Sequence, residues 1–341
     1  MAQPAACHTM SEATLRRLWR YRGWGAKILW PLSLLYGLLA RGRQALYRVG
    51  WLPAQHPGVP VIVVGNVIAG GAGKTPVVMA VVRHLQNQGW RPGVVSRGYG
   101  RRSHDCRSVP PDSHPDDVGD EPLLLARACK VPVAVAAKRM DAARHLRAQH
   151  PEVNIMVCDD GLQHWALERD IEICVFNEEG IGNGWLLPAG PLRESWPRAV
   201  DLVVHAGNPP TSSAPTFALK RQLAPWAVRA DGTQLPLAAL QGQGLVAVAA
   251  IARPEHFFAM LAAQGLQVEH AVALPDHFNF DGWRSPAQPG QPLLCTEKDA
   301  AKLWRHHPEA LAVPLHVEIA PGFFTALDAC LARTLSSRSS S

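Results

Sequence analysis

Short apolar runs that end in glycine-rich or acidic segments recur along this chain of 341 residues. The first run, VPVIVV at residues 59–64, is rich in β-branched residues, and apolar residues then recur at helical spacing over residues 77–85. A continuous β-branched run is typical of a strand buried on both faces, and the helical spacing predicts a helix that packs on it. A strand, a glycine-rich turn and a helix in this order indicate an α/β fold.

Two further strands predicted in the first half also end in polar segments. Residues 154–160 read NIMVCDD, so an apolar run ends at Asp159 and Asp160. Residues 94–102 read VVSRGYGRR, a strand that leads into a basic loop containing glycine. The carboxyl ends of strands in an open α/β sheet are where ligands bind. We therefore expect these segments to contribute to one site.

The second half of the chain repeats the order of strand and helix. LVAVAAI at residues 245–251 precedes a helical pattern, and PLLCTEKDAAKLW at residues 292–304 gives another strand and helix. Two α/β units with a site in the cleft between them are therefore expected. The predicted divisions are an N-terminal segment (1–51), a core with a mostly parallel sheet (52–205), a variable connection (206–243), a smaller α/β subdomain (244–335) and a disordered serine-rich tail (336–341).

The positive charge of the chain is concentrated at its N-terminus. The formal net charge is +6, but residues 1–48 hold eight basic residues and one acidic residue, and the rest of the chain holds 26 basic and 27 acidic residues. The globular part is thus nearly neutral, which argues against a basic surface built for nucleic acid. Apolar residues make up 47% of the chain and charged residues 18%, enough for a buried core over most of its length.

The basic N-terminal segment contains an apolar run of 13 residues, ILWPLSLLYGLLA at residues 28–40. A membrane-spanning helix needs about 20 apolar residues, so this run is too short to cross a bilayer. It also lacks the small-residue cleavage site of a signal peptide. Tryptophan and tyrosine interleaved with arginine are typical of a helix in the headgroup region of an anionic membrane. We favour that interpretation over a helix docked on its own domain.

The turn after the first predicted strand reads IAGGAGKT and opens the helix. Backbone N–H groups at such a helix N-terminus converge on one point, where a polyphosphate can bind. The lysine would reach the β and γ phosphates of ATP, and the threonine hydroxyl would hold Mg²⁺. Ile68 stands where the usual first glycine of this loop is expected. The predicted nucleotide-binding residues are Ile68, Ala69, Gly70, Gly71, Ala72, Gly73, Lys74 and Thr75.

A metal ion beside such a loop needs a carboxylate from a second strand, and Asp159 and Asp160 follow one. One of them would ligate the metal, and the other would bind its waters or the attacking group. The sequence leaves their assignment open, and a solvated Asp-Asp-Gly turn is the alternative.

The carboxylates at residues 118–126 allow two interpretations. VGDEPLLLA places Asp120 and Glu121 at the start of a predicted helix, with Pro122 at an early helical position. Acidic residues favour helix N-termini, so on physical grounds alone Asp120 is expected to cap the helix.

In combination, these segments resemble the tetraacyldisaccharide 4'-kinase family, the lipid A 4'-kinases of Gram-negative bacteria. The similarity covers roughly residues 11–335, and it departs from the family at residues 249–258, where Ala250 and Ala252 stand in place of glycine. The matching stretches are VVGNVIAGGAGKTP (63–76), VVSRGYGR (94–101), GDEP (119–122), DDGLQH (159–164), GNGWLLPAGPLRE (182–194), DH (276–277), TEKD (296–299) and, resembling the family's membrane-associated helix, PLSLLYGL (31–38).

The resemblance implies a P-loop NTPase-like core that transfers the γ-phosphate of ATP, with Mg²⁺, to an acylated glucosamine disaccharide 1-phosphate. The acceptor would be the 4'-hydroxyl, and the step would belong to lipid A biosynthesis. The protein would be peripheral on the anionic cytoplasmic face of the inner membrane, with no nucleic acid and no obligatory protein partner. By analogy Asp120 is the catalytic base and is supported by His277, which reverses the capping interpretation.

The resemblance assigns the remaining site residues by type. The implied catalytic residues are Asp120, His277, Lys74 and Arg193. The implied metal residues are Thr75, Asp159, Asp160 and Glu194. The implied substrate-binding residues are Ser96, Arg97, Gly98, Tyr99, Gln163 and His164.

Other classes of protein stay open as alternatives. A membrane-associated regulatory ATPase often reads K-G-G-x-G-K-T, but here Ala69 takes the place of its signature lysine. A soluble P-loop kinase for a small metabolite would not need a basic, tryptophan-rich N-terminus. A nucleotide-binding scaffold without activity would not need the complete set of acids.

Overall fold

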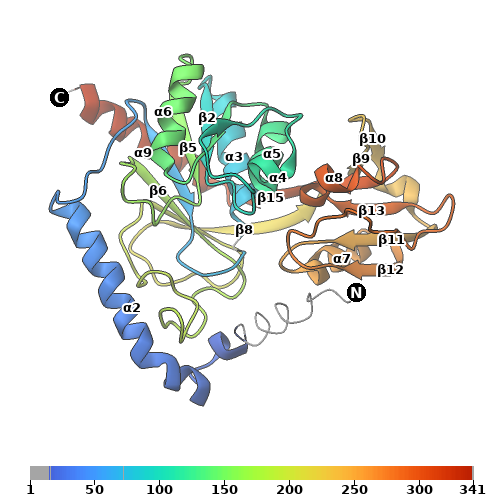
Figure 1. Cartoon of the computed structure of the whole chain (residues 1–341), viewed down its shortest axis with the longest axis horizontal. Coiled ribbons are helices and arrows are strands. Elements are labelled where there is room, and N and C mark those ends of the chain that lie inside the picture. The colour runs from blue at the N-terminus through green and yellow to red at the C-terminus, as the bar shows by residue number, and fades with distance from the viewer. Residues whose placement is uncertain (1–14, 16, 72, 340–341) are drawn as a thin grey trace.

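The computed structural model describes residue 15, residues 17–71 and residues 73–339, which form a long helix and two α/β lobes (Figure 1). The long helix, α2, spans Trp24–Arg48. We call the lobe with the nine-stranded sheet (residues 55–223 and 315–339) the core lobe, and the lobe with the six-stranded sheet (residues 226–313) the small lobe. The predicted α/β fold with two units is confirmed.

The sheet of the core lobe is parallel except at its two edges. Its strands are β1 (Val61–Gly65), β2 (Pro92–Ser96), β3 (Arg107–Ser108), β4 (Val133–Val135), β5 (Ile155–Asp159), β6 (Ile171–Phe176), β7 (Leu202–His205), β8 (Thr216–Leu223) and β15 (Leu315–Ile319). Their order is β15-β8-β7-β6-β1-β5-β2-β4-β3, and only β15 and β3 pair antiparallel with a neighbour. The segments that follow β1, β2 and β5 therefore lie at one edge of the sheet.

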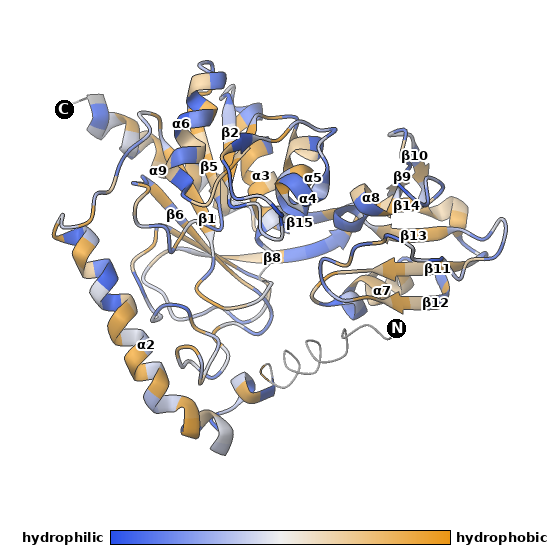
Figure 2. Cartoon of the chain, in the orientation of Figure 1, coloured by the Kyte–Doolittle hydropathy of each residue, from blue (hydrophilic) through white to orange (hydrophobic). Residues whose placement is uncertain are grey.

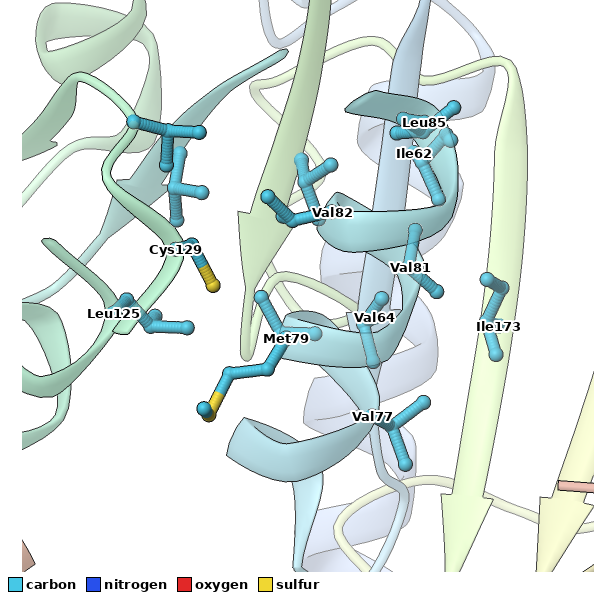
Figure 3. Close-up of a cluster of buried hydrophobic side chains, with 14 of the residues drawn as sticks. Ile62, Val64, Val77, Met79, Val81, Val82, Leu85, Leu125, Cys129 and Ile173 are labelled. Atoms are coloured by element: carbon cyan, nitrogen blue, oxygen red, sulfur yellow. The ribbon is translucent and has the colours of Figure 1, made fainter. Parts of the chain in front are cut away.

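Helices cover both faces of this sheet. They are α3 (Lys74–Asn87), α4 (Pro115–Val118), α5 (Asp120–Cys129), α6 (Arg139–Gln149) and α9 (Gly322–Ser339). Residues of α3, α5 and α9 form one buried cluster with the sheet, and residues of α6 form another on the opposite face. Figure 3 shows Val77, Val81 and Val82 of α3 with Ile62 and Val64 of β1. Burial on both faces explains the continuous β-branched run of β1.

The small lobe is built on a second, mixed sheet. Its strands are β9 (Trp226–Val228), β10 (Gln234–Pro236), β11 (Gly244–Ala249), β12 (Gln267–Ala273), β13 (Leu293–Thr296) and β14 (Leu311–Val313). Its helices are η1 (Leu237–Leu240), α7 (Pro254–Ala263) and α8 (Glu297–Leu303). The strand order is β10-β9-β14-β13-β11-β12. Because α8 packs against α5, the small lobe meets the core lobe where α5 begins.

The structure divides the chain differently from the predicted boundaries. β8 lies inside the predicted connection (206–243) but joins the core sheet beside β7, and β15 and α9 return to the core from the predicted subdomain (244–335). Burial along β8 alternates, so no continuous apolar run marks this strand in the sequence. The chain therefore crosses between the lobes twice, after β8 and after β14, and the two crossings lie side by side (Figure 1).

The predicted disordered tail (336–341) also needs correction, because α9 continues through Ser339. The Ser336 hydroxyl donates to the Ala332 carbonyl at 2.9 Å. The Arg338 guanidinium donates to Asp170 Oδ1 at 2.8 Å, which ties the last turn to the core lobe. Residues 340–341 lie outside the described part of the chain.

The buried residues of α2 at its contact with the core lobe are small. Ala26, Ser33 and Gly37 are buried, and the Ser33 hydroxyl donates to the Leu186 carbonyl at 2.9 Å. A Cβ atom at Gly37 would lie 2.6 Å from Leu186 Cδ1, so the Leu186 side chain would have to move to admit a larger residue. One face of α2 is therefore docked on the protein's own core lobe, as the alternative interpretation of this segment expected.

Large apolar side chains on another face of α2 are exposed to solvent. Hydrophobic residues recur along the whole ribbon of this helix (Figure 2). The exposed side chains recur every three to seven residues, as one helical face requires, and we call them the α2 stripe. The stripe consists of Trp24, Ile28, Leu32, Leu35, Leu39 and Leu46. Among the described residues, no helix is long and apolar enough to cross a membrane. Residues 1–14 and 16 of the predicted N-terminal segment (1–51) lie outside the described residues.

Candidate active site

The glycine-rich loop lies between β1 and α3, at the edge of the core sheet. Gly70 and Gly73 have φ values of +96° and +68°, a region that favours glycine. Gly73 caps the N-terminus of α3, and Lys74 and Thr75 form its first turn. The first N–H groups of a helix have no partner within the helix and carry its positive dipole end, so this loop is suited to bind an anion.

Two of the predicted nucleotide-binding residues instead hold the loop in place. The Ala69 N–H donates to the Pro191 carbonyl at 2.7 Å, so this donor is already used. Ile68 is buried and pairs with Leu192 in an isolated β-bridge. The start of the loop is thus fixed to the segment that carries Arg193. Ala72, another predicted nucleotide-binding residue, lies outside the described residues.

A pocket of about 250 Å³ lies between the two lobes beside this loop. Its polar lining includes Gly71, Gly73, Thr75, Glu121, Asp276 and Lys298. Its apolar lining includes Met79, Leu124, Leu223, Ile251, Phe257 and Met260. An apolar wall that ends at a phosphate-binding loop fits a nucleotide, with the base against the wall and the phosphates at the loop.

The two predicted metal-binding aspartates lie at the end of β5, and their environments differ. Lys74 Nζ lies 3.5 Å from Asp160 Oδ1, and the Arg193 guanidinium lies 3.5 Å from Asp160 Oδ2. Burial raises the pKa of Asp160, but the nearby cations outweigh burial and hold that pKa below its ordinary value. Burial and then the charge of Glu121 raise the pKa of Asp159 to about 7.

The oxygen atoms at this position fit a hard divalent cation. Among the described residues, Asp159 Oδ1 and Asp160 Oδ1 are buried without a hydrogen-bond partner. Carboxylate and hydroxyl oxygens such as these and that of Thr75 are the ligands that Mg²⁺ prefers. The described part of the chain has no cluster of three His, Cys, Asp or Glu side chains that could hold a metal ion, so waters and phosphate oxygens of a nucleotide would complete the coordination.

Glu194, which was also predicted to bind metal, is held by an arginine. Its Oε2 accepts a hydrogen bond from Arg198 at 2.9 Å, and Arg198 also contacts Glu172. Its Oε1 is buried and has no hydrogen-bond partner within the described residues. Glu194 is therefore oriented by Arg198 and keeps one oxygen available.

Asp120 and His277 meet across the boundary between the lobes. Asp120 opens α5 and is 7% exposed, and its Oδ2 accepts hydrogen bonds from His277 Nδ1 and from Lys302 Nζ, each at 2.8 Å. The carboxylate thus points toward the small lobe, which is not the capping geometry that local physics favours. His277 has a φ of +61°, uncommon outside glycine, and its N–H donates to the Ala250 carbonyl at 3.2 Å.

The contact between His277 and Lys298 indicates which nitrogen of the imidazole carries the proton. His277 Nε2 lies 3.4 Å from the ammonium group of Lys298, which can only donate. Asp276 Oδ1 lies farther from Nε2, at 3.8 Å. In the neutral imidazole with Nε2 as acceptor, Nδ1 carries the proton that is donated to Asp120. In Asp120 itself, burial raises the carboxyl pKa, but His277 and Lys302 outweigh burial and keep the pKa below its ordinary value.

Two glycines bring the basic loop after β2 to the start of α5. Gly98 has a φ of +68°, and a Cβ atom there would lie 2.6 Å from the Val118 carbonyl oxygen. A Cβ atom at Gly119 would lie 3.0 Å from Gly98 Cα, so the backbones touch. The ring of Tyr99 is exposed, and its centroid lies 5.4 Å from the centroid of the His277 ring. Tyr99 thereby forms a wall beside the Asp120–His277 pair.

The other predicted substrate-binding residues fall into two groups. Arg97 is exposed at the same loop as Tyr99. Ser96 is buried and lies 3.3 Å from Asp159 Oδ2, so it orients that carboxylate. Gln163 donates to the Asn66 carbonyl at 3.0 Å. Burial, followed by the charge of a nearby arginine, lowers the pKa of His164 to about 3.

The structure adds site residues for which sequence reasoning proposed no role. Lys298 contacts Asp276 at 3.0 Å and Glu121 at 3.9 Å, and Lys302 contacts Asp120. The available signal was the stretch TEKDAAK, which places two lysines four residues apart on one face of a predicted helix.

Comparison with known proteins places this architecture in a family. The family described as Tetraacyldisaccharide-1-P 4'-kinase matches residues 25–332. A tetraacyldisaccharide 4'-kinase from Acidovorax sp. (strain JS42) is 63% identical over 337 residues, or 99% of each chain, and one from Leptothrix cholodnii is 43% identical over 92% of each chain. The crystal structure of LpxK from Aquifex aeolicus in complex with ATP is similar with a TM-score of 0.79 and 27% identity, over 89% of this chain and 99% of that chain. The chain therefore belongs to the tetraacyldisaccharide-1-P 4'-kinase family.

Proposed function

We propose that this protein transfers the γ-phosphate of ATP to the 4'-hydroxyl of a tetraacyldisaccharide 1-phosphate, a step of lipid A biosynthesis. The observation that carries the proposal is that one pocket between the lobes is lined by both sets of residues. Gly73 and Thr75 of the phosphate-binding loop line it, and so do Glu121 and Asp276, the chain neighbours of Asp120 and His277. A phosphate donor and a hydroxyl acceptor would therefore meet in one cleft.

On the donor side, the loop and the start of α3 bind the phosphates. The backbone N–H groups and Lys74 attract the negative charge, and Arg193 adds a second cation from the other side of Asp160. Mg²⁺, held with the nucleotide by Thr75 and by Asp159 or Asp160, would neutralise charge on the transferring phosphate. Lys74 and Arg193 also pair with the Asp160 carboxylate, each at 3.5 Å.

On the acceptor side, Asp120 accepts the proton of the sugar hydroxyl. The hydroxyl oxygen forms a bond to the γ-phosphorus, the bond from that phosphorus to the β–γ bridging oxygen breaks, and ADP leaves. His277, with its proton on Nδ1, orients the carboxylate. Because His277 belongs to the small lobe, the pair is complete only when the lobes are together.

The N-terminal helix is proposed to keep the protein at an anionic membrane, as a peripheral protein on the cytoplasmic face of the inner membrane. The support is the α2 stripe, an exposed apolar face on a helix that also carries Lys27, Arg41 and Arg43. Acyl chains of the substrate would stay in the bilayer while the sugar enters the cleft.

The test of this function is whether ATP consumption depends on the lipid acceptor. Purified protein in detergent micelles should release ADP in step with phosphorylated tetraacyldisaccharide, and should release far less without the acceptor. A regulatory ATPase would release ADP at the same rate with and without this lipid. A kinase for a small metabolite would leave it unphosphorylated.

A further inference from the structure

Lys302 provides a contact to the proposed catalytic carboxylate from the other lobe. It lies on α8, and its Nζ donates to Asp120 Oδ2 at 2.8 Å and lies 3.4 Å from the His277 carbonyl oxygen. Its side chain is 12% exposed, so the ammonium group is largely removed from water. Lys302 and His277 thus use the same oxygen of Asp120, which leaves Oδ1 outside this pair of hydrogen bonds.

Other charged groups around Asp120 determine how much Lys302 stabilises its ionised form. Lys298 and Asp299 of α8 and His277, in the loop between β12 and β13, also act on Asp120 electrostatically, and Glu121 follows Asp120 in the chain. The negative charge of Asp299 opposes the ionisation of Asp120, and burial opposes it as well. An ammonium group at hydrogen-bond distance stabilises the ionised carboxylate and fixes its rotation at the same time.

We propose that Lys302 is a positioning residue for the phosphate transfer, which holds Asp120 Oδ2 against His277 so that Oδ1 receives the proton of the acceptor hydroxyl. This proposal rests on the proposed function and assigns no contact between Lys302 and either substrate. Because α8 belongs to the small lobe, approach of the lobes delivers the lysine and the histidine to Asp120 together.

A purely structural role, in which Lys302 only joins α8 to α5, makes different predictions from a positioning role. Loss of a structural tie lowers the unfolding temperature and leaves the pH dependence of turnover unchanged. Loss of a positioning cation lowers kcat, leaves the KM for ATP nearly unchanged, and moves the acidic limb of the kcat–pH profile to higher pH, because the pKa of Asp120 rises when a neighbouring cation is removed.

The experiment compares full-length wild type with Lys302→Met, Lys302→Arg and the control Lys220→Met, a change of the same type at an exposed position on β8. Lys302→Met should lower kcat by about 10- to 100-fold, as expected for a misplaced reacting group, and should move the acidic limb upward. In Lys302→Arg the acidic limb of the kcat–pH profile should stay at the wild-type pH. Lys220→Met should match wild type in kcat, in the KM for ATP and in the pH profile.

The outcomes separate this proposal from the proposed function. If wild type phosphorylates the lipid and Lys302→Met has the wild-type kcat and pH profile, the positioning role is overturned. If Lys302→Met does not fold, a shifted acidic limb in Lys302→Arg at reduced kcat contradicts the claim that charge at this position sets the limb. Absence of phosphate transfer by wild type overturns the proposed function itself.

Discussion

Asp120 Oδ2 and His277 Nδ1 lie 2.8 Å apart, although the two residues are 157 positions apart in the chain and belong to different lobes. The core lobe supplies the carboxylate at the start of α5, and the small lobe supplies the imidazole from a loop held by the Ala250 carbonyl. The pair exists only where the lobes meet, which is also where the phosphate-binding loop faces the pocket. The geometry thus links approach of the two lobes to assembly of the proposed acceptor site.

Replacing the carboxylate should separate catalysis from nucleotide binding. Asp120→Asn keeps the shape of the side chain but removes its ability to accept a proton. We expect kcat to fall by about 100-fold or more, the usual effect of losing a general base. ATP affinity, measured by calorimetry, should change little. An equal loss of kcat and of ATP affinity would assign Asp120 to a structural role.

Replacing the lysine of the phosphate-binding loop should weaken the binding of ATP. Lys74→Met removes a cation that would contact the nucleotide phosphates, and a hydrogen bond between charged groups contributes about 1.5–3 kcal/mol. We expect ATP affinity to fall by about 10- to 100-fold, as measured by calorimetry, with Lys220→Met as the matched control. Unchanged ATP affinity in Lys74→Met would contradict the assignment of the loop.

The α2 stripe should determine binding to anionic vesicles. The triple variant Ile28→Glu, Leu35→Glu and Leu39→Glu removes three exposed apolar side chains, each worth roughly 1.5 kcal/mol or more when buried in lipid. Partitioning onto phosphatidylglycerol vesicles, measured by sedimentation, should fall by more than about 100-fold. Leu335→Glu, at an exposed apolar position on α9, is the control and should sediment like wild type. Undiminished sedimentation of the triple variant would exclude the stripe as the membrane contact.

Stability should decrease in mild acid because of His164. Its pKa is about 3 in the folded protein, lowered by burial, and about 6.5 in the unfolded chain. Between these values the unfolded chain binds a proton that the folded protein does not, so the free energy of unfolding falls as pH decreases from 6.5 toward 3. His164→Gln should lose less stability than wild type between pH 7.5 and pH 5 in urea titrations. Parallel losses in the two proteins would show that His164 is solvated.

Continuous apolar runs made part of this structure predictable. β1 and β5 are buried along their whole length, so their sequences alone indicated the sheet, the loop after β1 and the position of Asp159. β8 was missed because its burial alternates, so the strand contains no continuous apolar run. A local sequence pattern therefore predicts a strand that is buried on both faces more readily than a strand whose burial alternates.

The role of Asp120 shows a different limit. A carboxylate at a helix N-terminus interacts favourably with the helix dipole whether or not it also takes part in catalysis. The local sequence therefore cannot distinguish a capping residue from a catalytic base. The distinction comes from His277 and Lys302, which the fold brings from the other lobe. For α2, the sequence showed an apolar helix, but only packing on Leu186 revealed which face is buried and which is exposed.

The most direct test of the account is the site and extent of phosphorylation of the tetraacyldisaccharide 1-phosphate by wild type and Asp120→Asn. With ATP and Mg²⁺, wild type should add one phosphate to the 4'-hydroxyl, as located by NMR of the product, and Asp120→Asn should form less than about 1% as much in the same time. A wild-type product phosphorylated elsewhere, no product, or equal product from the variant would contradict the account.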